Sequence, residues 1–110
     1  MMHLVELTPA ARVDLEAIYA QLVDRAGTGL ADQFFAAVRH WRAQLSRHPE
    51  LGRPRRFRRP ELAGLRSLNC GGRFTNYLVF YRLDHDRPVV IRLLHGARDL
   101  EAALLEPLGE

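Results

Sequence analysis

The sequence predicts an α+β fold in which a helical hairpin packs on a small antiparallel sheet. The first half of the chain holds two amphipathic stretches separated by Gly27-Thr28-Gly29, and the second half holds three strand-like runs separated by turn sequences. The expected order is strand, helix, helix, strand, strand, strand, with a short helix at the end. A chain of 110 residues is the size of one domain, so we expect residues 1–110 to form a single unit.

Two helices are predicted between residues 8 and 48, after a short first strand that should join the sheet. Thr8 can cap the first helix, and Pro9 suits its first position, where an N–H is not needed. Thr28 can cap the second helix, which should end near His48 because Pro49 disfavours helical geometry in the residue before it. Apolar residues at spacings of three and four form two stripes, namely Ala11, Leu15, Ile18, Leu22 and Ala26, then Leu30, Phe34, Val38, Trp41 and Leu45.

Residues 49–64 contain three prolines, two glycines and five arginines, and this composition predicts a loop. Three strands should follow over residues 65–70, 74–82 and 88–95, with Gly71-Gly72 as a tight hairpin turn. A short helix from Asp99 to Leu105 is expected, because the negative charge of Asp99 near its start favours the helix dipole.

Strict alternation along the last two strands predicts which side chains share a face. The run over 74–82 should place Phe74, Asn76, Leu78 and Phe80 on one face, and Thr75, Tyr77, Val79 and Tyr81 on the other. The run over 88–95 should place Val89, Ile91 and Leu93 opposite Val90, Arg92 and Leu94.

Several classes of protein are excluded by composition. No apolar run approaches the roughly 20 residues that span a bilayer, and the N-terminus lacks the pattern of a signal peptide, so we expect a cytoplasmic protein without membrane contact. Cys70 is the single cysteine, which excludes an internal disulfide. The five histidines show no metal-ligand spacing and no phosphate-binding loop is present, so we expect neither metal nor cofactor.

The charge of the chain is unusual in kind. The net charge is +3, and all sixteen basic residues are arginines, which form forked hydrogen bonds with carboxylates and phosphates. Five of them lie close together in the predicted loop, namely Arg53, Arg55, Arg56, Arg58 and Arg59. This cluster either contacts phosphates or an acidic partner, or is a solvated loop; a third possibility is that it holds an acidic tail of a partner protein.

Five segments, in order along nearly the whole chain, resemble the RelE/ParE superfamily of toxins, and its ParE branch of plasmid stabilisation proteins most of all. They are the stripe over 14–19, the Pro-Glu-Leu-Gly turn at 49–52, the strand over 64–68, the run Asn76-Tyr77-Leu78-Val79-Phe80-Tyr81-Arg82, and the last strand with its exit over 91–100. The resemblance implies a toxin of a type II toxin–antitoxin system that arrests growth. ParE-like members poison DNA gyrase, whereas RelE-like members cut messenger RNA at the ribosome.

The resemblance also implies a partner. Such toxins are neutralised by an antitoxin, here expected to be a ParD-like protein with a ribbon-helix-helix domain, and the complex binds operator DNA only through that antitoxin. Antitoxin tails fold on binding, so we expect one to bury part of the helical hairpin and the sheet edge over 65–70.

A ribonuclease without metal needs a base, a cation and an acid at one point. By the resemblance, Arg98 stands where such nucleases keep an arginine, but their late tyrosine falls on or near Leu104 and their central-strand arginine at about Tyr77. His95, Arg98 and Tyr81 are the catalytic candidates if the protein is a nuclease. Because this set is incomplete, the sequence favours a gyrase inhibitor over an enzyme; a member of the fold that has lost toxicity is the third reading.

Residues that contact the target or the antitoxin are expected among the arginines and at the exit of the last strand. Arg98 and Asp99 have the alternative of capping and pairing locally at the start of the short helix. The candidates are Arg53, Arg55, Arg56, Arg58, Arg59, Arg66, Arg98 and Asp99.

Overall fold

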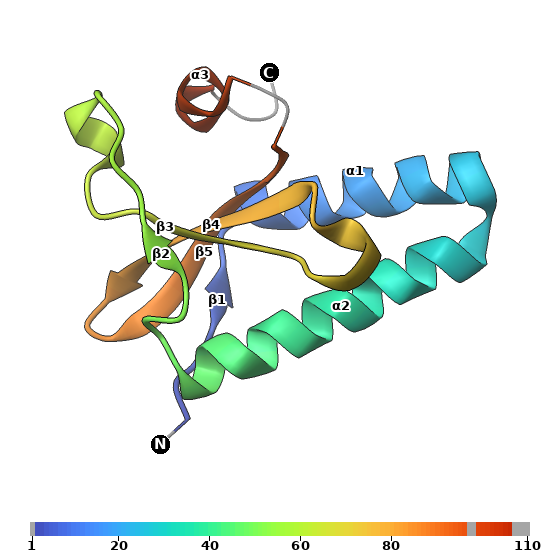
Figure 1. Cartoon of the computed structure of the whole chain (residues 1–110), viewed down its shortest axis with the longest axis horizontal. Helices are drawn as coiled ribbons and strands as arrows, with labels where there is room; N and C mark the ends of the chain where they lie inside the picture. Colours follow the sequence, from blue (N-terminus) through green and yellow to red (C-terminus); the bar gives the residue numbers. More distant parts are fainter. Residues whose placement is uncertain (1, 97–98, 107–110) are drawn as a thin grey trace.

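The computed structural model describes residues 2–96 and 99–106 and has the α+β architecture that the sequence predicts (Figure 1). The strands are β1 (Glu6–Leu7), β2 (Arg53–Pro54), β3 (Arg66–Asn69), β4 (Tyr77–Asp84) and β5 (Arg87–His95). The helices are α1 (Pro9–Ala26), α2 (Thr28–Arg47) and α3 (Leu100–Leu105), with short 3₁₀ turns η1 (Pro60–Leu62) and η2 (Gly72–Phe74).

The five strands form one sheet in the order β1-β5-β4-β3-β2. The first strand joins the sheet as predicted, but it pairs parallel to β5, with Glu6 opposite Val89, so the sheet is mixed and not wholly antiparallel. The other neighbours are antiparallel. Short turns force antiparallel pairing, whereas the long connection from β1 to β5 permits either direction.

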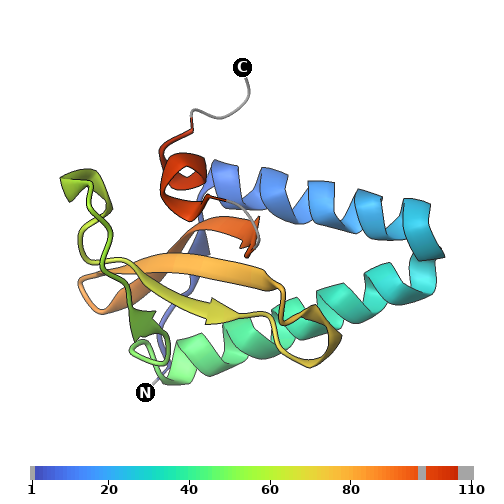
Figure 2. The ribbon, with the colours of Figure 1, turned by 45° about the horizontal axis from the view of Figure 1, so that its top comes forward.

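The α1–α2 hairpin covers one face of the sheet (Figures 1 and 2). Both predicted stripes belong to the core between them, except that Ala26 at the end of the first stripe is exposed. Trp41, Phe34 and Leu45 of α2 are essentially inaccessible to solvent and belong to the same core cluster as Val79 and Tyr81 of β4. Burial of large side chains against a sheet supplies most of the stability of such a fold.

The start of the hairpin confirms one predicted cap and corrects another. The Thr8 hydroxyl accepts a hydrogen bond from the Ala11 N–H at 3.2 Å, and Pro9 occupies the first turn of α1. Thr28 does not cap α2, because α2 already begins at Thr28 and Gly27, with φ at +81°, is the boundary residue of both helices. A left-handed residue lets the chain reverse within one position, and glycine adopts it without steric cost.

The strands differ from the predicted runs in two connections. A two-residue strand, β2, forms inside the predicted loop because Arg53 and Pro54 pair with β3. The connection between β3 and β4 is longer than a tight turn, since η2 follows Gly71 and delays the start of β4 to Tyr77.

A β-bulge changes the predicted faces of the last strand. The register between β4 and β5 shifts between Phe80 and Tyr81, which leaves Ile91 without a direct partner on β4. Val90 and Leu93 therefore pack in the core under the hairpin, while Ile91 and Leu94 lie with a second cluster that also contains Phe80 and Ala103. A bulge inserts one residue and so reverses the alternation beyond it. The faces predicted for β4 are otherwise as expected, except that Phe74 packs in the main core.

Within the described ranges, no helix combines the length and the apolarity that crossing a membrane requires.

Candidate functional site

The arginine segment (residues 53–59) runs from β2 toward η1 on the side of the sheet that carries the second cluster. Arg55 is its most constrained member: its guanidinium lies 5.4 Å from the ring centroid of Phe57 and 5.6 Å from that of Phe80, and it donates a hydrogen bond to the Ser67 hydroxyl at 3.0 Å. Partial burial, with the nearby charge of Arg53, lowers the pKa of Arg55. The Arg55 side chain, which lies over the rings of Phe57 and Phe80, therefore holds the arginine segment against the sheet.

Arg59 and Arg66 are also engaged within the fold. Arg59 forms an exposed ion pair with Glu61 at 3.0 Å, and its backbone N–H donates to the Glu101 carboxylate of α3 at 2.8 Å. Arg66 donates to the carbonyl oxygens of Glu50 at 3.2 Å and Gly52 at 2.8 Å, which fixes the turn after α2.

The remaining arginines of the segment, Arg53, Arg56 and Arg58, have exposed side chains. A hollow of about 590 Å³ lies between Arg58 and Arg59 on one side and α3 on the other, where Asp99 and Glu101 line it. Acidic side chains of α3 thus offset part of the positive charge near Arg58. The segment is consequently most cationic around Arg53 and Arg56.

Tyr81, one of the candidate nuclease residues, is completely buried. Its hydroxyl accepts a hydrogen bond from the Gly52 N–H and donates one to the Pro49 carbonyl, both at 2.8 Å. Burial is the main cause of the raised pKa of this phenol. The structure therefore places Tyr81 behind the turn after α2, where it holds that turn against the sheet.

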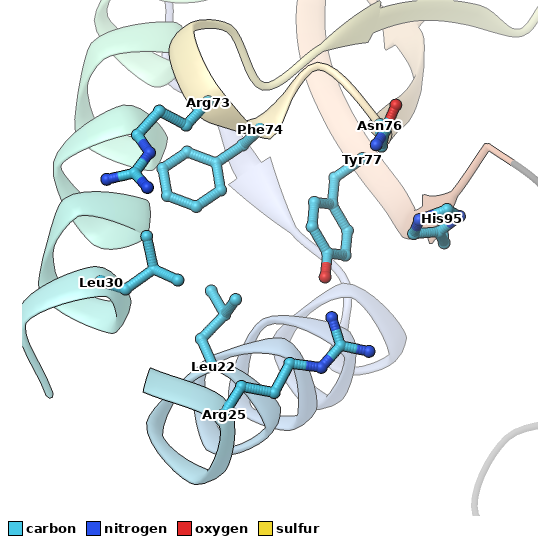
Figure 3. A pocket seen from close by; sticks show the side chains of 8 residues that line it. All are labelled: Leu22, Arg25, Leu30, Arg73, Phe74, Asn76, Tyr77 and His95. Atoms are coloured by element: carbon cyan, nitrogen blue, oxygen red, sulfur yellow. The ribbon is translucent and has the colours of Figure 1, made fainter. Parts of the chain in front are cut away.

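His95 has an exposed side chain at the end of β5. Its ring lies edge-on to that of Tyr77, with 5.4 Å between the centroids. Both rings line a hollow of about 210 Å³ together with Arg25 of α1 and Arg73 of η2 (Figure 3). Sequence reasoning missed Arg25 and Arg73, because no spacing in the chain connects the end of α1 with the β3–β4 connection.

The structure describes only part of the segment that leads from β5 to α3. Arg98 lies outside the described residues. Asp99 caps α3, since its carboxylate accepts a hydrogen bond from the Ala102 N–H at 3.2 Å. Leu104, on or near which the resemblance implies the late tyrosine of RelE-like nucleases, packs against the second cluster beside Ala103.

A buried ion pair that the sequence did not predict joins α1, β5 and α3. Arg92 donates to Asp14 through Nε at 2.7 Å and Nη2 at 3.1 Å, and through Nη1 to the Ala103 carbonyl at 3.1 Å. An arginine inside the apolar run Val89–Leu94 was the available signal, because a charge is buried only with a partner.

In the part of the chain that the structure describes, no group of three or more His, Cys, Asp or Glu residues could hold a metal ion.

This arrangement of a helical hairpin on a five-stranded sheet is found in toxin–antitoxin structures. The chain is similar to the chromosomal ParDE system from P. aeruginosa with a TM-score of 0.68 and 22% identity, over 86% of this chain and 96% of that one; at this identity the likeness shows the fold. It is also similar to the toxin–antitoxin complex RelBE2 from Mycobacterium tuberculosis, with a TM-score of 0.56 and 30% identity over 89% of this chain and 95% of that one.

The sequence comparisons are more specific than the fold. Toxin ParE1 of Mycobacterium tuberculosis, strain H37Rv, is 31% identical over 99 residues, which cover 89% of this chain and 94% of the relative. The family described as "ParE toxin of type II toxin-antitoxin system, parDE" matches residues 5–100, and the chain belongs to this family.

Proposed function

We propose that this protein arrests growth by binding and inhibiting DNA gyrase, and that a ParD-like antitoxin neutralises it in the cytoplasm. Membership of the ParE family supports the class of activity. One observation carries the choice of gyrase over RNA. Leu104 of α3 packs against the second cluster, and the resemblance implies that the tyrosine used for proton transfer by RelE-like nucleases falls on or near this residue. A leucine can neither donate nor accept a proton, so this face favours binding over catalysis.

Ribosome-dependent cleavage of messenger RNA is the second candidate. His95 and Tyr77 lie beside one another, and Arg25 lines the same hollow (Figure 3). Histidine is a frequent general acid–base residue, and an arginine suits stabilisation of a phosphate charge. The proximity of His95, Tyr77 and Arg25 therefore supports the nuclease candidate more strongly than the sequence alone.

Purified full-length protein separates the two candidates. Loss of gyrase supercoiling on relaxed plasmid, with ribosome-bound messenger RNA left intact, is the expected result. Cleavage of the RNA that His95→Ala removes and His40→Ala leaves unchanged would establish the nuclease, since both histidines are exposed and only His95 lines the hollow. Failure of both assays, without growth arrest on expression, would indicate a member of the family without toxicity.

We further propose that the acidic tail of the antitoxin binds the arginine segment and the neighbouring sheet edge. Arg53, Arg56 and Arg58 are exposed there. The edge differs from the one expected over 65–70, because β2 pairs with Arg66 and Ser67 and leaves the stretch from Leu68 at the open side of β3. In the complex, the ribbon-helix-helix domain of the antitoxin would contact operator DNA.

A further inference from the structure

The hollow beside the α1–α2 connection, at the closed end of the helical hairpin, carries a concentration of hydrogen-bond donors. Arg25 comes from the last turn of α1, Arg73 from η2, and Tyr77 with His95 from the adjoining ends of β4 and β5. Leu22 and Leu30 form the apolar part of the wall and Asn76 completes the rim. Five elements, namely α1, α2, η2, β4 and β5, therefore meet around one volume of about 210 Å³.

The charges around this hollow are of one sign. No aspartate or glutamate is among the described residues that line it, and two of the eight are arginines. Arg73 donates one hydrogen bond, from Nη1 to the Gln33 amide oxygen at 3.3 Å, and a guanidinium has four further N–H groups. The site is therefore matched to an anion and not to a cation or a purely apolar ligand.

The positions of the two guanidinium groups indicate the shape of that anion. Figure 3 shows Arg73 on one side of the hollow and Arg25 on the other, with the Tyr77 hydroxyl directed toward Arg25. A planar carboxylate is satisfied by one arginine fork, whereas a tetrahedral phosphate offers oxygens to donors on opposite sides. Donors on two walls thus favour phosphate.

We propose that this pocket binds the phosphate group of a small ligand, either free phosphate or a mononucleotide. Arg25 and Arg73 hold the phosphate oxygens and the Tyr77 hydroxyl donates a third hydrogen bond. A phosphate group fills only part of this volume of about 210 Å³, and the nucleoside of a mononucleotide extends past the edge-on rings of Tyr77 and His95. This is the hollow that the alternative nuclease set of His95, Tyr77 and Arg25 lines, whereas with gyrase as the proposed target it is a separate ligand site.

Titration of the full-length protein with inorganic phosphate and with AMP, followed by calorimetry and by amide chemical shifts, tests this site. Shifts should concentrate around residues 22–30 and 73–77. Arg25→Gln and Arg73→Gln should each weaken binding by about tenfold, the loss expected for one charge-assisted hydrogen bond. Tyr77→Phe, which retains the ring, should weaken it less. Arg12→Gln is the matched control, because Arg12 is exposed on the same helix α1 and does not line the hollow.

The probes also separate the sources of the phosphate. Tighter binding of AMP than of phosphate identifies a nucleotide site, and equal binding identifies a site for the phosphate alone. Equal weakening by Arg12→Gln and Arg25→Gln would reduce the effect to net charge and overturn the proposal. Binding of acetate as tight as that of phosphate, or no binding of either phosphate probe to a protein whose spectrum shows it folded, would also overturn it.

Discussion

Asp14 and Arg92, 78 residues apart in the chain, form a two-pronged ion pair that fastens α1 to β5. The same carboxylate accepts the Leu93 N–H at 2.9 Å, and the same guanidinium reaches the Ala103 carbonyl of α3 at 3.1 Å. The side chain of Asp14 is 12% exposed and that of Arg92 is 8% exposed. Each charge is therefore stabilised by the other and not by water.

Asp14→Ala should destabilise the protein strongly, by about 3 kcal/mol, because it leaves the Arg92 charge buried without its partner. Urea unfolding followed by circular dichroism measures this change. The double variant Asp14→Leu with Arg92→Met should recover much of the loss, since an apolar pair has no charge to desolvate. Asp24→Asn, at an exposed position of the same helix, should change stability by less than about 0.5 kcal/mol. A similar effect of Asp14→Ala and Asp24→Asn would contradict the importance of the pair.

Gly52→Ala should destabilise the turn after α2. A Cβ at this position would lie 2.6 Å from Cε1 and 2.8 Å from the hydroxyl oxygen of Tyr81, whose ring is buried and cannot move aside. Overpacking of this kind costs about 1–3 kcal/mol. Gly29→Ala is the control, because nothing lies within 4 Å of its added Cβ, and it should be neutral or slightly stabilising. Thermal unfolding of the two variants compares them directly.

Stability should fall as the pH rises above 9 because of Cys70. Burial raises the pKa of this thiol from 9.0 to about 12, against a smaller opposing effect of Trp41. Below pH 9 the thiol keeps its proton in both states; between 9 and 12 the unfolded chain loses it while the folded protein retains it. The free energy of unfolding therefore decreases with pH, by up to about 1.4 kcal/mol per pH unit.

Comparison with Cys70→Ala isolates this effect, since the tyrosines titrate in both proteins. The variant should be less stable at neutral pH, because it leaves a small cavity, but its decline with pH should be shallower. Parallel curves for the two proteins would show that the thiol is not protected. Slow reaction of native Cys70 with a thiol reagent at pH 9 is the corresponding chemical test.

Exposed arginines of the arginine segment should govern the binding of an acidic antitoxin tail. Replacing Arg53, Arg56 and Arg58 by Gln should weaken binding and reduce its dependence on salt, because exposed charges are screened within about 10 Å at 0.1 M salt. The matched control replaces the exposed helical residues Arg12, Arg39 and Arg47, which removes the same charge. Calorimetry with the tail peptide at two salt concentrations compares the two triple variants; equal losses would assign the effect to net charge.

Features set by neighbouring residues could be predicted from the sequence. The apolar stripes, the Thr8 cap and the Pro49 stop act within a few positions, and the structure confirms the two helices they define. The order of the last three strands also follows from short connections, which leave few alternatives. The α+β class therefore follows from the sequence alone.

Features that depend on distant contacts could not be predicted. Alternation along β5 gave incorrect faces because the bulge opposite Phe80 and Tyr81 depends on pairing with β4 and leaves no mark in the composition of either strand. The parallel direction of β1 has the same origin. The pocket beside His95 is formed by Arg25 and Arg73 only after the hairpin has closed on the sheet, so composition pointed to the arginine segment instead.

The pairing of β1 with β5 has a consequence for synthesis of the protein. Leu7 lies opposite Val90, and the Thr8 N–H donates to the Val90 carbonyl at 3.0 Å, so the start of the chain rests on a strand made near its end. While residues 87–95 are still inside the ribosome tunnel, the emerging helices lack β5, one of the strands that they cover, and their apolar stripes remain exposed. A translation stop before that point yields a fragment without β5, the strand between β1 and β4, and newly made chains reach the native state only after release of nearly the whole sequence.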